Sequence, residues 1–77
     1  MEHAVLEIEV DGSGRFRYDL FTPRKHRLLS FAGKRGTFDM AGRSVKEIAA
    51  DITEEQARYE YRILSWSVLE SPRGTLA

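Results

Sequence analysis

The sequence predicts an α+β fold: a small antiparallel sheet, built from two hairpins and a long bent C-terminal strand, with one short helix packed on a face. The predicted order of elements is β-β-β-β-α-β. Residues 4–10 and 15–21 alternate between apolar and polar side chains, which is the pattern of half-buried strands. Residues 45–52 place apolar side chains at helical spacing, and residues 58–63 alternate again. These patterns predict strands at both ends of the chain and a helix between them.

The first hairpin spans residues 4–21 and turns at Asp-Gly-Ser-Gly, residues 11–14. Facing residues across a hairpin share a side of the sheet, so even-numbered positions must pair with even-numbered positions. A loop closed by Asp11 and Arg15 satisfies this rule, with Gly14 in the left-handed conformation that a type I turn with a bulge requires. The predicted pairs are Val10 with Phe16, Ile8 with Tyr18 and Leu6 with Leu20 on one side, and Asp11 with Arg15, Glu9 with Arg17, Glu7 with Asp19 and Val5 with Phe21 on the other.

A second hairpin is predicted from residues 27–32 and 37–40, which flank the turn Gly33-Lys34-Arg35-Gly36. Its pairing sets Phe31 against Phe38 and Leu29 against Met40, so that the apolar side chains share one side of the sheet.

A short helix is predicted after Gly42. Ser44 and Glu47 form a capping box, in which the serine oxygen accepts from the amide of Glu47 and the glutamate carboxylate reaches back. The apolar side chains that follow at helical spacing are Val45, Ile48, Ala49 and Ile52. A helix of about two turns does not persist alone, so we expect it to dock on the sheet.

Residues 53–70 fit two structures. In a helix, Thr53 opens a second capping box, and Ala57, Tyr61, Leu64 and Val68 share one face. In a strand, residues 58–63 alternate and carry aromatic side chains suited to a sheet. The apolar side then switches to Leu64, Trp66 and Val68, which requires a bulge or bend near Ile63. We favour the long bent strand.

Length and composition predict a single domain over residues 1–77, with residues 71–77 as a flexible tail. A second domain has no room, because domains usually need at least ~50 residues. No apolar run approaches the ~18–20 residues that cross a bilayer, so no membrane association is expected. The absence of cysteine excludes disulfides and thiolate metal sites and fits a cytoplasmic location.

Catalysis is the least expected class of function. Cysteine is absent, and only His3 and His26 titrate near neutral pH, one near the chain terminus and one in a basic loop. Asp51, Glu54 and Glu55 are close in sequence but fit a solvated helix end better than a metal site. A chain this short is unsuited to enclosing a deep active-site cavity. We therefore expect no enzyme, no cofactor, no metal and no small-molecule substrate.

Charge is segregated along the chain: the net charge is −4 in residues 1–14, +7 in residues 15–46 and −3 in residues 47–77. The basic middle predicts an alternative function, binding of RNA or single-stranded DNA. The turn at residues 33–36 resembles, in residue type, the GXXG loop with which KH domains clamp a nucleic-acid backbone. That loop joins two helices, whereas strands are predicted here on both sides, so a plain hairpin turn is favoured. The candidate nucleic-acid-binding residues are Arg24, Lys25, His26, Arg27, Lys34 and Arg35.

The leading hypothesis is a small non-catalytic protein-interaction or accessory module, with self-association as one form of that interaction. The predicted register places Val5 against Phe21 on the outer side of the first hairpin, and Leu28 extends this apolar strip. Apolar side chains on the second face of a small sheet favour a covering element or a partner. We therefore expect a protein partner or a homo-oligomer, with Val5, Phe21 and Leu28 at the interface.

Overall fold

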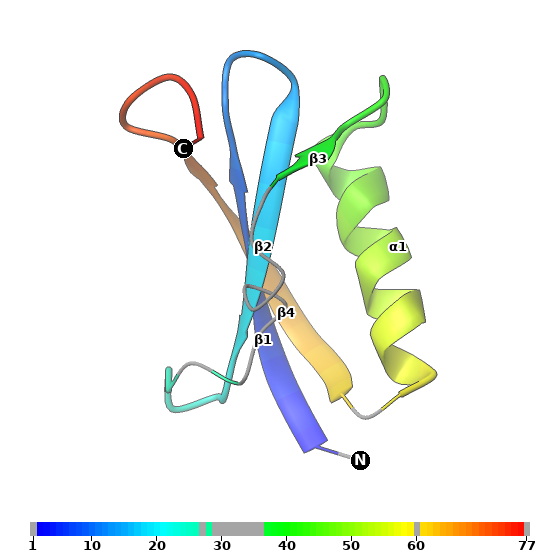
Figure 1. Ribbon diagram of the computed structural model, residues 1–77. Helices are drawn as coiled ribbons and strands as arrows, with labels where there is room; N and C mark the ends of the chain where they lie inside the picture. Colours follow the sequence, from blue (N-terminus) through cyan, green and yellow to red (C-terminus); the bar gives the residue numbers. More distant parts are fainter. Residues whose placement is uncertain (1, 27, 29–36, 60, 77) are drawn as a thin grey trace.

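The computed structural model describes residues 2–26, 28, 37–59 and 61–76. Within them, four strands form one sheet in the spatial order β3-β2-β1-β4, and one helix packs on it (Figure 1). The elements in chain order are β1 (Glu2–Val10), β2 (Arg15–Phe21), β3 (Phe38–Asp39), α1 (Val45–Ala57) and β4 (Tyr61–Glu70). The α+β class predicted from the sequence is confirmed.

The sheet is mixed, so the prediction of a purely antiparallel sheet is wrong. β1 pairs antiparallel with β2, and β2 pairs antiparallel with β3, but β4 runs parallel to β1. The physical reason is the helix: α1 carries the chain back along the sheet, so the next strand starts at the end where β1 starts (Figure 1). The predicted second hairpin falls mostly on residues 29–36, outside the described residues, and Phe38 pairs with Phe16 of β2.

The first hairpin has the predicted register from Val5–Phe21 to Val10–Phe16. Gly14 adopts a φ of 82°, as the predicted turn requires, and the backbone N–H of Asp11 donates to the carbonyl of Arg15 over 3.0 Å. On the outer side, Arg17 and Glu9 form an ion pair at 2.8 Å.

The segment from residue 53 to residue 70 divides between the two structures that its sequence fits. α1 continues to Ala57, five residues beyond the predicted short helix, and Thr53 lies inside it, donating its hydroxyl to the carbonyl of Ala49 over 2.7 Å. A strand starting at Arg58 was therefore wrong, because Arg58 and Tyr59 form the turn that follows the helix. The predicted bulge is confirmed: Ile63 faces Ala4 and Ser65 faces Val5, which leaves Leu64 as the extra residue.

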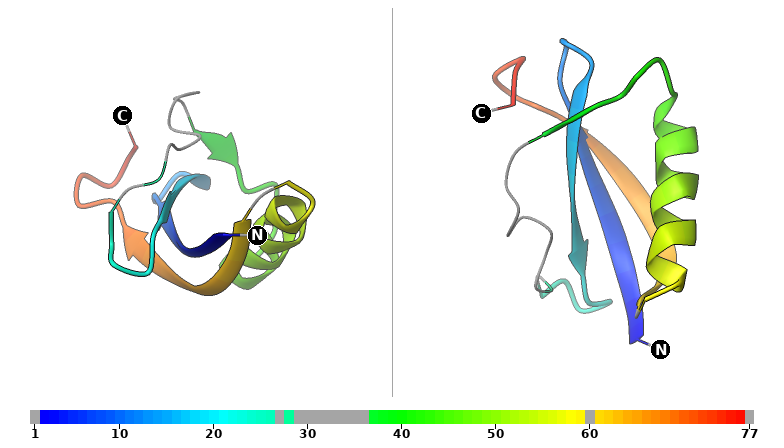
Figure 2. Two further views of the ribbon diagram at one scale, coloured as in Figure 1. Left: turned by 90° about the horizontal axis from the view of Figure 1, so that it is seen from below. Right: turned by 45° about the vertical axis from the view of Figure 1, so that its right-hand side comes forward.

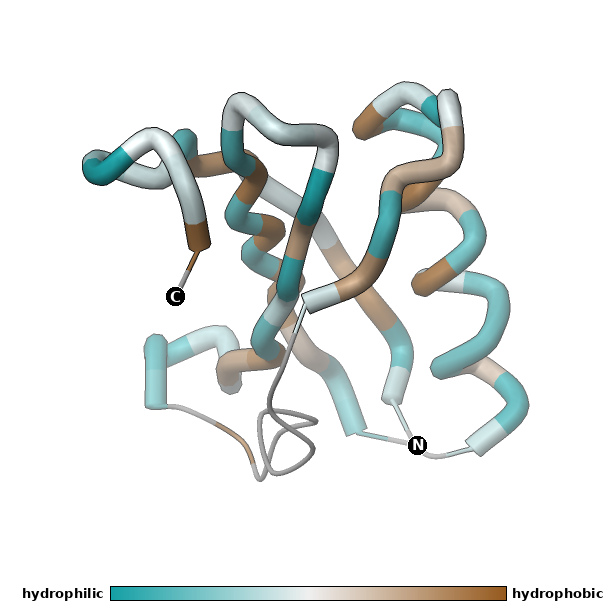
Figure 3. The backbone as a smooth tube through the Cα atoms, turned by 45° about the horizontal axis from the view of Figure 1, so that its top comes forward, coloured by the Kyte–Doolittle hydropathy of each residue, from teal (hydrophilic) through white to brown (hydrophobic). Residues whose placement is uncertain are grey.

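The core lies between α1 and one face of the sheet (Figure 2). Apolar and polar residues alternate along β1 and β2 (Figure 3), and the apolar residues on one side of these two strands form the buried cluster with α1. The buried apolar residues are Ala4, Leu6 and Ile8 of β1, Phe16 and Leu20 of β2, and Ile48, Ala49 and Ile52 of α1.

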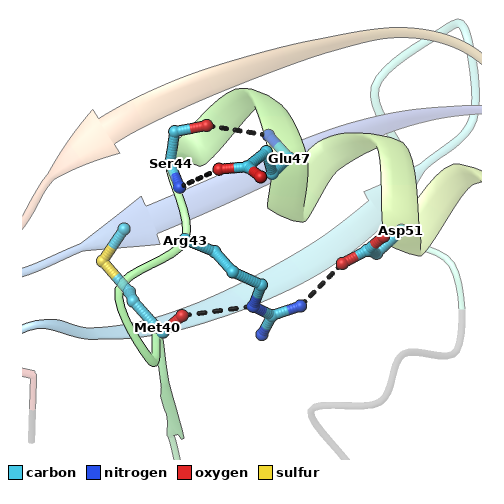
Figure 4. Close-up of polar contacts among 5 residues, drawn as sticks. All are labelled: Met40, Arg43, Ser44, Glu47 and Asp51. Carbon is cyan, nitrogen blue, oxygen red and sulfur yellow. Dashed lines mark hydrogen bonds and ion pairs between the residues drawn. The ribbon is translucent and has the colours of Figure 1, made fainter.

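The start of α1 is held by the predicted capping box (Figure 4). Ser44 Oγ accepts from the backbone N–H of Glu47 over 3.1 Å, and Glu47 Oε1 accepts from the backbone N–H of Ser44 over 2.9 Å. Arg43 joins the preceding turn to the helix, because its guanidinium donates to the carbonyl of Met40 and to Asp51 Oδ2. These hydrogen bonds fix the start of α1, which packs on one face of the sheet.

Residues 71–76, expected to form a tail, fold against the turn between β1 and β2 (Figure 1). The backbone N–H of Gly12 donates to the carbonyl of Gly74 over 3.1 Å. The backbone N–H of Leu76 donates to Asp11 Oδ2 over 3.0 Å. These contacts place the end of the described chain at the far end of the sheet from Tyr61.

Candidate protein-interaction surface

β4 lies at the edge of the sheet, and its outer side has no strand partner within the part of the chain that the structure describes. β1, which lies between β2 and β4, buries Ala4, Leu6 and Ile8 completely, at 0% exposure. The apolar side chains of β4 are instead exposed: Leu64 by 53%, Trp66 by 42%, Val68 by 38% and Leu69 by 50%. These four residues are called the β4 surface below.

A groove of about 450 Å³ runs between α1 and β4. Its floor is apolar because Ala49 and Ala50 of the helix carry small side chains opposite Leu64 and Trp66 of the strand. The residues that line it are Lys46, Ala49, Ala50, Thr53 and Glu54 of α1 and Ile63, Leu64, Ser65 and Trp66 of β4.

The pairing of β4 with β1 places Trp66 and Val68 on the helix side of the sheet, whereas Leu69 pairs with Glu9 and lies on the opposite side. Trp66 pairs with Leu6 and Val68 pairs with Ile8, so both occupy the side of the sheet that carries α1. The bulge at Leu64 adds one residue, which brings Leu64 beside the groove as well. Ser65 and Ser67 pair with Val5 and Glu7 and therefore occupy the opposite side.

The charges near this surface lie at the ends of β4 and on the helix side of the groove, which Lys46 and Glu54 line. Arg62 and Glu70 are exposed near the start and at the end of β4. On the helix, Glu54 pairs with Arg58 at 3.1 Å, but both side chains are more than 70% exposed, so this pair contributes little to stability. The centre of the β4 surface is apolar.

The interface residues predicted from the sequence lie elsewhere. Val5 and Phe21 face each other on the side of the sheet opposite α1 and are half-buried. They line a hollow of about 210 Å³ together with Glu7, Pro23, Lys25 and Ser67. Leu28 packs against the buried core, and its backbone N–H donates to the carbonyl of Leu20 over 2.8 Å.

The structure describes three of the six residues of the predicted basic patch. Arg24, Lys25 and His26 are exposed in the turn after β2, where Lys25 adopts a φ of 69°. The turn is closed by Thr22, whose carbonyl accepts from the backbone N–H of Lys25 over 2.7 Å. Arg27, Lys34 and Arg35 lie outside the described residues, so the structure brings together three of the six predicted cations.

The β4 surface was missed by sequence reasoning even though its pattern was visible. The sequence predicted that Leu64, Trp66 and Val68 share a side. The register places Trp66 and Val68 on the helix side, whereas Leu64 is the bulge residue and pairs with no residue of β1. Their exposure depends on β4 being an edge strand, and strand order does not follow from the sequence.

The three groups with a shifted pKa, Asp11, Tyr18 and Glu47, do not line the groove beside β4. The backbone N–H of Leu76, with those of Arg15 and Ser13, holds the pKa of Asp11 well below its usual range. Hydrogen bonds from Ser44 lower the pKa of Glu47. Burial and the nearby charge of Glu55 raise the pKa of Tyr18 to about 12.

Among residues 2–26, 28, 37–59 and 61–76, no group of three or more His, Cys, Asp or Glu side chains is placed to hold a metal ion. The same residues contain no helix that is both long and apolar enough to cross a membrane. Comparisons with protein-family models, with curated proteins and with solved structures found no match for this chain.

Proposed function

We propose that this chain is a small non-catalytic protein-interaction module that binds a partner polypeptide along the outer side of β4. One observation carries the proposal: an edge strand of ten residues exposes Leu64, Trp66, Val68 and Leu69 by 38–53%. Proteins usually shield such edges with prolines, lysines or covering loops, because an exposed apolar edge recruits further strands. β4 contains neither proline nor lysine.

The expected mode of binding is strand addition. The backbone N–H and C=O groups on the outer side of β4 pair with an extended segment of the partner, which supplies affinity independent of sequence. Alternate side chains of that segment enter the groove between α1 and β4, whose apolar floor at Ala49 and Ala50 favours apolar side chains. Strand addition therefore selects an extended, alternating apolar segment.

Site-specific photo-cross-linking tests this proposal. A photoreactive phenylalanine analogue replaces Trp66 in one variant and Tyr59 in the control, because Tyr59 is 74% exposed and lies outside the β4 surface. We expect irradiation in cells to join position 66, and not position 59, to a polypeptide that mass spectrometry identifies. The absence of a polypeptide adduct at position 66, or equal adducts at both positions, would contradict the proposed function.

Binding of RNA or single-stranded DNA stays a separate hypothesis, which the exposure of Arg24, Lys25 and His26 in one turn favours. It predicts an affinity that falls steeply with salt concentration, since cations that contact phosphates release counterions. Titration of labelled single strands at several salt concentrations, with Arg24→Ala and Lys25→Ala, measures this. Undetectable binding at low salt removes the hypothesis. We also propose a cytoplasmic location, because the sequence contains no cysteine.

A further inference from the structure

We infer that Tyr18, Phe38 and Glu55 form a binding site for a weakly hydrated organic cation, a quaternary ammonium or guanidinium group. The site is bordered by β2, β3 and α1, whereas the groove described above lies between α1 and β4. It therefore goes beyond the proposed function and does not depend on it.

Three aromatic rings lie together on the helix side of β2 and β3. Phe16 pairs with Phe38 across the two strands, and their ring centroids are 5.5 Å apart. The Tyr18 ring lies 6.5 Å from that of Phe16 and 6.2 Å from that of Phe38. The ring planes are inclined to one another by 21–35°, so the three rings form one continuous aromatic surface.

Part of this aromatic surface is open to solvent. Phe16 is buried in the core, with 4% of its surface exposed, and supports the other two rings. Phe38 lies on the edge strand β3 and is 45% exposed. Tyr18 is half-buried and packs against the core. Phe38 and Tyr18 therefore supply the aromatic surface that a ligand can reach.

Glu55 supplies a negative charge beside these rings. It follows Thr53 by two positions, which turns its side chain by about 200° away from the groove that Thr53 lines. Its charge, together with burial, raises the pKa of Tyr18, so the carboxylate lies near the phenol.

The charge of Glu55 is also available to a ligand. Its side chain is exposed and forms no ion pair with any residue that the structure describes. Its neighbours in the helix differ, because Asp51 pairs with Arg43 at 2.7 Å and Glu54 pairs with Arg58 at 3.1 Å.

Aromatic rings beside a carboxylate are complementary to an organic cation. The face of an aromatic ring attracts a positive charge, and quaternary ammonium and guanidinium groups are the cations most often held in this way. Such cations lose little hydration when they contact an apolar ring, whereas a small inorganic ion loses much more. The carboxylate of Glu55 adds attraction for the cation and repels anionic ligands such as phosphate groups.

Nuclear magnetic resonance of the purified chain tests the inference. The probes are tetramethylammonium chloride, which represents a free ammonium compound, and N-acetyl-arginine amide, which represents an arginine side chain of a polypeptide. Sodium chloride keeps the ionic strength constant. We expect saturable shifts of the Phe38 and Tyr18 ring signals at millimolar concentrations of at least one probe, and the probe that binds more tightly identifies the source of the cation. The absence of saturable shifts with both probes would overturn the inference.

Matched variants test the residues assigned to the site. We expect Glu55→Gln and Phe38→Leu each to weaken binding of the probe by at least about threefold. Glu54→Gln and Tyr59→Leu are the controls and should leave the affinity unchanged, because they remove an adjacent carboxylate and an exposed aromatic ring outside the site. Circular dichroism identifies folded variants, and Glu55→Gln, an exposed substitution, decides the test if Phe38→Leu does not fold. An affinity that Glu55→Gln leaves unchanged, or that Glu54→Gln weakens equally, would overturn the inference.

Discussion

At the scale of single residues, Asp11 shows how a short side chain joins distant parts of the chain. Its Oδ1 accepts from the backbone N–H groups of Ser13 and Arg15 over 2.8 and 3.0 Å, which shapes the turn between β1 and β2. Its Oδ2 accepts from Leu76, 65 residues further along. The turn contacts follow from the local sequence Asp-Gly-Ser-Gly, whereas the bond to Leu76 depends on the path of β4 and was not predictable.

Asp11→Asn is expected to destabilise the fold near neutral pH, because the amide accepts these hydrogen bonds less strongly than the carboxylate does. Folding lowers the pKa of Asp11, so its contribution is complete above the pKa of the unfolded chain, about 3.9, and is lost as the pH falls through the lower folded pKa. The difference in melting temperature between the two proteins should therefore shrink below about pH 4. Thermal unfolding followed by circular dichroism across pH measures it.

The matched control is Asp39→Asn, since Asp39 also accepts a backbone N–H, from Ala41 over 2.8 Å, within one turn. We expect a smaller change in melting temperature for this variant. A difference between Asp11→Asn and the unmodified chain that is the same at every pH would contradict the role assigned to the carboxylate.

At the scale of elements, local rules predicted what local contacts determine. The hairpin register follows from alternating side chains and a turn of fixed length, and the start of α1 follows from its capping box. The end of α1 was misplaced, because residues 53–57 suit a helix and residues 58–63 alternate like a strand. In the structure the helix ends at Ala57, Arg58 and Tyr59 form a turn, and β4 begins at Tyr61.

Removing the cap of α1 tests whether the capping box holds the element that borders the groove. Ser44→Ala is expected to lower the free energy of unfolding by about 1 kcal/mol, because the N–H of Glu47 loses its acceptor. Ser44→Thr retains an acceptor and should keep most of the stability. Chemical denaturation of the three proteins measures the difference, and equal losses in both variants would contradict a capping role.

At the scale of the whole molecule, the proposed function depends on strand order. The alternation of Leu64, Trp66 and Val68 is compatible with a central strand or with an edge strand, and only the placement of β4 beside β1 exposes them. Strand order is decided by contacts between residues far apart in the chain, which a pattern read along the sequence does not record. Val5 and Phe21 were selected because the hairpin was predictable, while the β4 surface required the complete sheet.

Hydrogen–deuterium exchange along β4, measured with and without the polypeptide that cross-links to position 66, tests this account most directly. Alternate residues of a strand point their amides to opposite sides, so half of the β4 amides face the outer edge rather than β1. If that polypeptide adds its strand there, these amides between Ser65 and Leu69 should exchange more slowly in its presence, while those of β2 stay unchanged. Exchange rates along β4 that the polypeptide does not change would contradict strand addition.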